Sequence, residues 1–205
     1  MSVRKAITET NGIYFVTITN FAWLHLFSIS DGYVAVFKCP SDRVSRAGFD
    51  YLKSKGHLII GYVIMPNHLH CLIAFLDTEG KSINTIIGSG KRFMAYDLVD
   101  RLEKKSEQEL LAQLPCGVNP TDRKRGKFHE VFEPSFDCKP CLSVAFIEQT
   151  INYIHANPCR GKWNLVQNHS DYEHSSAKFY LHGIHSCYRV TSYGEIADMD
   201  LTKNE

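Results

Sequence analysis

The stretch Gly61-Tyr-Val-Ile-Met-Pro-Asn-His-Leu-His-Cys-Leu-Ile-Ala-Phe75 holds two apolar runs separated by Pro66 and Asn67. A proline followed by an asparagine between apolar runs is typical of a turn. Residues 58–65 and 68–75 are therefore predicted to form the two strands of an antiparallel hairpin.

The second strand of this hairpin carries two histidines, His68 and His70. Side chains at positions i and i+2 leave the same face of a strand, so both imidazoles should lie together. One interpretation is a structural pair at the edge of the core. The other is a metal site, because buried imidazoles need a polar partner and neutral imidazole is a favoured ligand of divalent ions.

The segments around the hairpin alternate between strand and helix patterns. Residues 13–19 alternate and are rich in β-branched and aromatic side chains, which favours a strand. The other predicted elements are helices at 41–55, 82–105 and 142–156, a short strand at 128–136, and irregular chain at 115–126 and after Trp163. This order is close to the split βαβ pattern, and it predicts an α+β fold with a central antiparallel sheet and helices on one face.

Length and composition favour a globular protein of one domain. The chain has 205 residues, of which 44% are hydrophobic. No run approaches the ~18 apolar residues of a membrane helix, and the N-terminus lacks the apolar core of a signal peptide. We expect a cytoplasmic protein without a membrane partner.

The seven cysteines are scattered and odd in number, which suits reduced thiols in a reducing compartment. Cys138 and Cys141 have the spacing of half a zinc site, but no second pair accompanies them. Two free cysteines beside a loop proline are the favoured interpretation.

The formal net charge of +1 does not by itself indicate a nucleic-acid partner. Basic residues nevertheless cluster, and such clusters can contact phosphates, although many are simply solvated loops. The candidate DNA-binding residues are Lys91, Arg92, Arg123, Lys124 and Arg125.

On the last predicted helix, Tyr153 and Asn157 are four residues apart and share one face. A tyrosine hydroxyl beside a metal-bound phosphate can act as a nucleophile, and an amide oxygen suits Mg²⁺ or Mn²⁺. Two imidazoles and one amide oxygen leave positions open for phosphate oxygens, which indicates phosphodiester chemistry. The structural alternatives are a core tyrosine and a helix C-terminal asparagine.

Four stretches carry a family resemblance. They are Met65–Cys71, Phe132–Phe136, Tyr153–Pro158 and Asp171–Ser176. In this order they resemble the single-tyrosine HUH transposases of the IS200-like superfamily, in particular the REP-associated branch, named for repetitive extragenic palindromes. The resemblance covers residues from about 13 to 180, so we expect a catalytic domain over 1–180 and a C-terminal extension of unknown role over 181–205.

The resemblance implies a ferredoxin-like, RRM-like fold and a defined chemistry. Its metal ligands would be His68, His70 and Asn157, holding Mg²⁺ or Mn²⁺, and Tyr153 would be the nucleophile. The implied reaction is the nicking and rejoining of single-stranded DNA, at hairpin or palindromic repeats, through a 5′-phosphotyrosine. No nucleotide cofactor is needed, and the enzyme would act as a monomer or a homodimer.

Two alternatives belong to other functional classes. An RRM-like module would bind single-stranded nucleic acid without catalysis, and a metal-dependent hydrolase would use water in place of Tyr153. His155 is off the face of Tyr153 and is not expected to be a ligand. Tyr172, Ser175 and Ser176 match a family motif, but a polar loop packed on the tyrosine helix explains them equally well.

Overall fold

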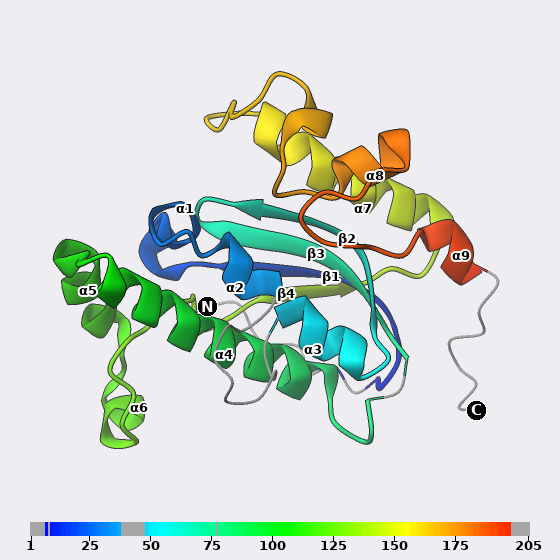
Figure 1. The fold of residues 1–205 in the computed structure, drawn as a ribbon. Coiled ribbons are helices and arrows are strands. Elements are labelled where there is room, and N and C mark those ends of the chain that lie inside the picture. The colour runs from blue at the N-terminus through cyan, green and yellow to red at the C-terminus, as the bar shows by residue number, and fades with distance from the viewer. Residues whose placement is uncertain (1–6, 8, 38–47, 77, 198–205) are drawn as a thin grey trace.

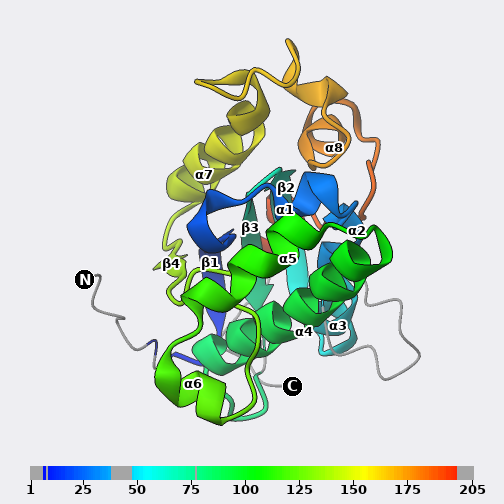
Figure 2. The same ribbon diagram turned by 90° about the vertical axis from the view of Figure 1, so that its left-hand side faces the viewer.

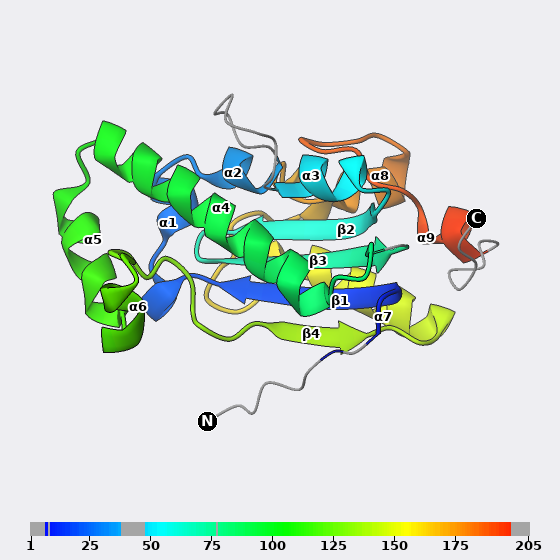
Figure 3. The ribbon, with the colours of Figure 1, turned by 90° about the horizontal axis from the view of Figure 1, so that it is seen from below.

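The computed structural model describes residues 7, 9–37, 48–76 and 78–197. A four-stranded antiparallel sheet forms its centre, with the strands in the spatial order β2-β3-β1-β4 (Figure 3). The strands are β1 (Gly12–Thr19), β2 (Leu58–Met65), β3 (His68–Phe75) and β4 (Asp137–Pro140). β3 lies between β1 and β2, which is the split βαβ arrangement, so the predicted α+β fold is confirmed.

One face of the sheet packs against three helices. These are α2 (Tyr33–Phe37), α3 (Gly48–Ser54) and the long α4 (Ile83–Lys104). Ile83, Ile87 and Leu98 of α4 join Leu69 and Ile73 of β3 in the larger apolar core. The Ser82 hydroxyl caps α4 by accepting from the Thr85 N–H at 3.2 Å.

A helix also covers the opposite face, which corrects the expectation that all helices lie on one side (Figures 1 and 2). This helix is α7 (Val144–Ala156), capped by Ser143. Its residues Ile147, Ile151 and Ile154 form a second core with Val63 and Leu72. The apolar stripe of α7 recurs at helical spacing, and burying it requires a sheet face.

The free edge of β2 is closed by the segment that follows η4 (His169–Asp171). The Ile64 N–H donates to the His174 carbonyl at 2.9 Å, and the Ser176 N–H donates to the Tyr62 carbonyl at 3.0 Å. The Tyr172 hydroxyl adds a hydrogen bond to the Ile64 carbonyl at 2.8 Å. This motif therefore protects the edge of β2. Its contact with the tyrosine helix, which the structural interpretation expected, is made by the Ser176 hydroxyl to His155 of α7.

Three predicted segments differ from the structure. The expected irregular chain at 115–126 contains two short helices, η2 (Leu114–Gly117) and α6 (Pro120–Lys124). The expected strand at 128–136 is irregular chain with one bridge, between Phe132 and Asn20, and β4 begins only at Asp137. Of the predicted helix at 41–55, residues 48–54 are helical, and 41–47 lie outside the described residues.

Short helices complete the described chain. They are η1 (Phe21–Trp23), α1 (Leu26–Ile29), α5 (Gln108–Gln113), η3 (Asn157–Cys159), α8 (Ala177–His182) and α9 (Tyr193–Ala197). The region after 181 is packed on the fold, since Val190 and Ile196 are buried in the two cores. Among the residues described, none belongs to a helix long and apolar enough to cross a membrane.

The larger core predicts a clear contrast between two leucines. Leu98→Ala empties a fully buried position, so it should lower the free energy of unfolding by about 2–5 kcal/mol. Leu142→Ala, at a side chain that is 90% exposed, should change it by less than about 0.5 kcal/mol. Urea unfolding of both variants measures the difference, and equal effects would contradict the packing described.

Candidate functional site

His68 and His70 lie on the α7 face of the sheet, where they are buried beside one another. Their ring centroids are 4.7 Å apart. In the register of the central strands, His68 is opposite Thr19 and His70 is opposite Thr17 of β1. The predicted convergence of the two imidazoles is therefore present.

Asn67 orients the His68 ring. The Asn67 Nδ2 donates to the Trp23 carbonyl at 3.2 Å, so Oδ1 is the atom directed at His68. The His68 Nδ1 lies 2.7 Å from this Oδ1, which can only accept, so Nδ1 carries the proton. In the neutral ring Nε2 then has the free lone pair, which is the state needed by a metal ligand.

Thr17 performs the corresponding role for His70. The Thr17 Oγ1 lies 2.9 Å from the His70 Nδ1. The Phe15 ring packs against the same imidazole, with centroids 5.4 Å apart. With Nδ1 engaged, Nε2 is the nitrogen left for a further partner.

Burial keeps both imidazoles neutral. It lowers the pKa of His68 to about 4, helped by the nearby charge of Lys162. It lowers the pKa of His70 to about 3, helped by the proximity of His68. At pH 7 both rings are therefore in the form that binds metal ions.

Tyr153 projects from α7 over this pair. Its ring centroid is 5.3 Å from that of His70 and 6.0 Å from that of Phe15. The side chain is 48% exposed, which does not fit the alternative of a core tyrosine. The Tyr153 side chain is therefore accessible to solvent and to a ligand.

Asn157 lies at the C-terminal end of α7, where η3 begins. Its Nδ2 donates to the Tyr153 carbonyl at 3.4 Å. Its side chain also lies close enough to the His68 ring to raise the pKa of His68 against the effect of burial. The structure thus brings His68, His70, Tyr153 and Asn157 to one place. Across the described residues no group of three or more His, Cys, Asp or Glu side chains is placed to hold a metal, so an ion here would need the Asn157 amide.

His155 is directed away from this site, as its position on the helix predicted. Its Nε2 lies 2.9 Å from the Ser176 Oγ, in the buried layer between α7 and β2. The same Oγ accepts from the Tyr62 N–H at 3.0 Å. His155 therefore joins α7 to the edge motif.

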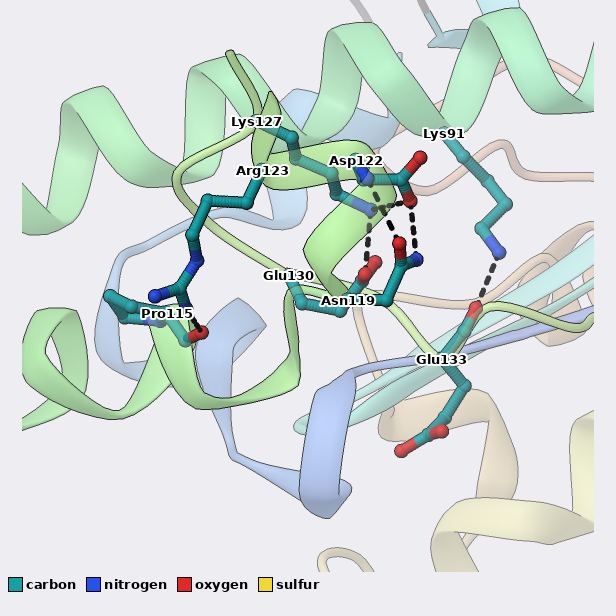
Figure 4. Close-up of polar contacts among 8 residues, drawn as sticks. All are labelled: Lys91, Pro115, Asn119, Asp122, Arg123, Lys127, Glu130 and Glu133. Atoms are coloured by element: carbon teal, nitrogen blue, oxygen red, sulfur yellow. Dashed lines mark hydrogen bonds and ion pairs between the residues drawn. The ribbon is translucent and has the colours of Figure 1, made fainter. Parts of the chain in front are cut away.

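The predicted DNA-binding cations lie on α4 and α6, across the sheet from α7 (Figure 1). Lys91 donates to the Glu133 carbonyl at 2.7 Å, and Arg123 donates to the Pro115 carbonyl at 2.9 Å (Figure 4). Arg92 lies over the ring of its neighbour Phe93. Lys124 is the last residue of α6 and Arg125 follows it. The structure does not bring any of these residues to the histidines.

The cysteine pair shows no sign of a site. Cys138 and Cys141 are free thiols, as are the other cysteines among the described residues. Burial raises the pKa of Cys138 to about 12, so its thiol stays protonated at neutral pH.

Sequence reasoning missed the residues that surround the histidines. Sequence patterns place Thr17 in a strand and Asn67 in a turn, but the role of each depends on strand register and on turn geometry. Lys162 lies close enough to affect the pKa of His68, whereas the basic clusters at 91–92 and 123–125 lie elsewhere. Trp23 and Trp163 also contact His68, with ring centroids 6.2 and 6.0 Å away.

Comparison with known proteins supports the fold. A solved structure described as the REP-associated tyrosine transposase bound to a REP hairpin matches 100% of this chain and 99% of its own, at 15% identity and a TM-score of 0.58. A candidate transposase from Deinococcus radiodurans R1 matches 74% of this chain and 95% of its own, at 15% identity and a TM-score of 0.39, too distant to bear on the fold. Neither a family model nor a curated protein matches the sequence. The full-length likeness to the first structure confirms the fold that the motifs implied.

The lowered histidine pKa values predict acid sensitivity of the metal-free protein. Burial lowers the pKa of His155 to about 4 from its ordinary 6.5, as it does for His68. Between pH 4 and pH 6.5 the unfolded state binds more protons than the folded state. The contribution of these histidines to the free energy of unfolding is therefore complete above pH 6.5 and is lost as the pH drops towards 4. Each such histidine adds at most about 1.4 kcal/mol per pH unit to this slope.

Urea unfolding in EDTA at several pH values measures the effect. The variant His155→Gln should show a shallower slope than the parent protein over the same window, because one of the contributing groups is gone. An unchanged slope would show that His155 is already protonated in the folded protein near pH 6.

Proposed function

We propose that this protein is a metal-dependent transesterase that nicks and rejoins single-stranded DNA through Tyr153, next to a hairpin. The observation that carries the proposal is the convergence of Tyr153 and Asn157 from α7 and η3 on the His68–His70 pair of β3. The family resemblance of the motifs supports the reaction type. The hairpin in the related transposase structure supports the substrate class.

The donor set fits Mg²⁺ or Mn²⁺. His68 and His70 are neutral, and their Nδ1 atoms are occupied by Asn67 and Thr17, so Nε2 of each ring is available. Asn157 would add an amide oxygen, the hard ligand type that Mg²⁺ and Mn²⁺ prefer. When bound, the ion would supply positive charge that stabilises phosphoryl oxygens in the transition state.

The chain itself supplies the nucleophile. The Tyr153 Oη attacks the phosphorus, and the Oη–P bond forms as the bond from phosphorus to the 3′ oxygen breaks. The tyrosine proton passes to solvent, and the departing 3′ oxygen takes up a proton. The 5′ end stays attached to Tyr153, and attack by another 3′-hydroxyl reverses the step and joins a new strand.

A single protomer holds the complete set. Tyr153 contacts His70 of its own chain, and Asn157 contacts His68 of its own chain. We therefore propose that no tyrosine from a second copy is needed for cleavage. The proposed site acts in cis, and this holds for a monomer and for a homodimer alike.

The decisive experiment mixes the full chain with labelled single-stranded hairpins taken from palindromes beside its own gene, in Mn²⁺ or in EDTA. We expect a denaturant-resistant protein–DNA adduct in Mn²⁺ that is absent in EDTA and in Tyr153→Phe. The matched control is Tyr96→Phe, which removes the hydroxyl of a tyrosine that is 65% exposed on α4. Binding without an adduct would favour the RRM-like module, and turnover without an adduct would favour a hydrolase that uses water.

The role of Thr17 gives a second test that does not depend on DNA. Thr17→Val removes the hydroxyl that orients His70, and the loss of such a partner costs about 10–100-fold in metal affinity. Thr19→Val makes the same change on the same strand face, opposite His68, where the side chain of Asn67 already holds the ring. Titration of Mn²⁺ by calorimetry should show weaker binding for Thr17→Val alone, and equal affinities for the two variants would contradict this assignment.

A further inference from the structure

An aromatic cluster borders the histidine pair on its solvent side. We call it the aromatic rim and define it as Trp23, His25 and Trp163. The Trp23 and Trp163 rings lie 6.2 and 6.0 Å from that of His68, and His25 lies 5.5 Å from Trp163. Two separate segments supply the rim, the turn after β1 and the chain after η3, which lie at the same end of the sheet (Figure 1).

Trp23 is presented to solvent by a backbone that is held in place. Ala22 and Trp23 have φ angles of 49° and 58°, in the left-handed region that bulky residues seldom adopt. The Ala22 N–H donates to the Glu133 carboxylate at 2.9 Å, and the Trp23 carbonyl accepts from the Asn67 side chain at 3.2 Å. Strain of this kind persists only where the surroundings impose it, and it concentrates at ligand sites.

The packing of the fold does not account for this arrangement. Trp23 is 58% exposed, so its large ring contributes little to the core. Trp23 thus has a backbone held in place and an accessible ring beside the two buried histidines. This arrangement is typical of a site on which a planar group stacks.

A positive charge lies beside the Trp163 side of the rim, whereas the Glu133 carboxylate at the Trp23 side is engaged by the Ala22 N–H. The Lys162 ammonium lies 5.3 Å from the Trp163 ring centroid and affects His68 electrostatically. Aromatic faces with an adjacent cation match a nucleotide, which offers a flat base and an anionic phosphate. An aliphatic or anionic-peptide partner would use only one of these two features.

We propose that Trp23 and Trp163 form a stacking site for an unpaired nucleobase of the DNA strand whose phosphate lies at Tyr153. This inference rests on the proposed function and adds to it the residues that bind the DNA strand. Lys162 contacts the phosphate next to that base. The rim thereby fixes which internucleotide bond faces the tyrosine.

Intrinsic fluorescence tests this directly, because the chain contains two tryptophans and both belong to the rim. The protein used is Tyr153→Phe in EDTA, so that binding is observed without cleavage. The probes are an oligothymidylate of about 20 nucleotides and an abasic strand with the same number of phosphates. We expect the oligothymidylate to quench the emission and to bind more tightly, whereas the abasic strand leaves the emission unchanged at saturation.

Variants identify the residue responsible. Trp23→Ala should weaken oligothymidylate binding on the order of tenfold, and Trp23→Phe, which keeps an aromatic ring, should restore most of it. The matched control is Phe128→Ala, which removes a ring that is 71% exposed in the segment between α6 and β4. Thermal unfolding checks that each variant is folded.

The outcomes separate the two proposals. Equal affinity of Trp23→Ala and Phe128→Ala, or equal binding of the abasic and thymidylate strands, overturns the stacking site even if the parent protein forms its adduct. If Trp23→Ala is unfolded, the comparison of the abasic strand with the oligothymidylate still tests the stacking site, because it needs no variant at the rim. Quenching by the oligothymidylate without any adduct on hairpin DNA supports the stacking site and contradicts the transesterase.

Discussion

The antiparallel pairing of β1 with β3 is the constraint on which the site depends. It places Thr17 opposite His70 and Thr19 opposite His68, and it fixes which face of β3 meets α7. Because side chains alternate along a strand, a shift of one residue would move both histidines to the face covered by α4. The large apolar side chains of the opposite parity, such as Leu69 and Ile73, prevent that shift, since they fill the main core.

The α7 face has to combine an apolar core with a polar site. Ile147, Ile151 and Ile154 pack over the β2 side of the sheet and leave Tyr153 on the helix face above His70. Buried imidazoles would be costly if their nitrogens lacked partners, and Thr17 and Asn67 supply one partner to each ring. Sheet register, helix packing and local hydrogen bonds thus act on the same few side chains.

The parts of the fold that the sequence predicted have strong local signals. The Pro66–Asn67 turn defines the hairpin, and serine caps with long apolar periodicity define α4 and α7. The elements that the sequence did not predict have weak local signals. β4 is a short and mostly exposed edge strand that pairs through its backbone. α6 is a single turn that is capped by Asn119 and has no apolar face. Periodicity showed that α7 has an apolar side, but it does not say which face of the sheet receives it. For the site, the sequence supplied His68, His70, Tyr153 and Asn157, whereas the residues that orient them required the register and the turn geometry.

Asn67 connects the histidine pair to the aromatic rim. Its Oδ1 accepts from His68 and its Nδ2 donates to the Trp23 carbonyl, so one planar amide holds both groups. The two hydrogen bonds cannot change independently, because rotation of the amide that improves one alters the other. Under the proposed function, a DNA strand that displaced the Trp23 turn would also disturb the orientation of His68, whereas a DNA strand that fitted the turn would leave it intact. The basic residues on α4 and α6 lie across the sheet and have no such connection. Under the proposed function they would add affinity for DNA without selecting the phosphate at Tyr153.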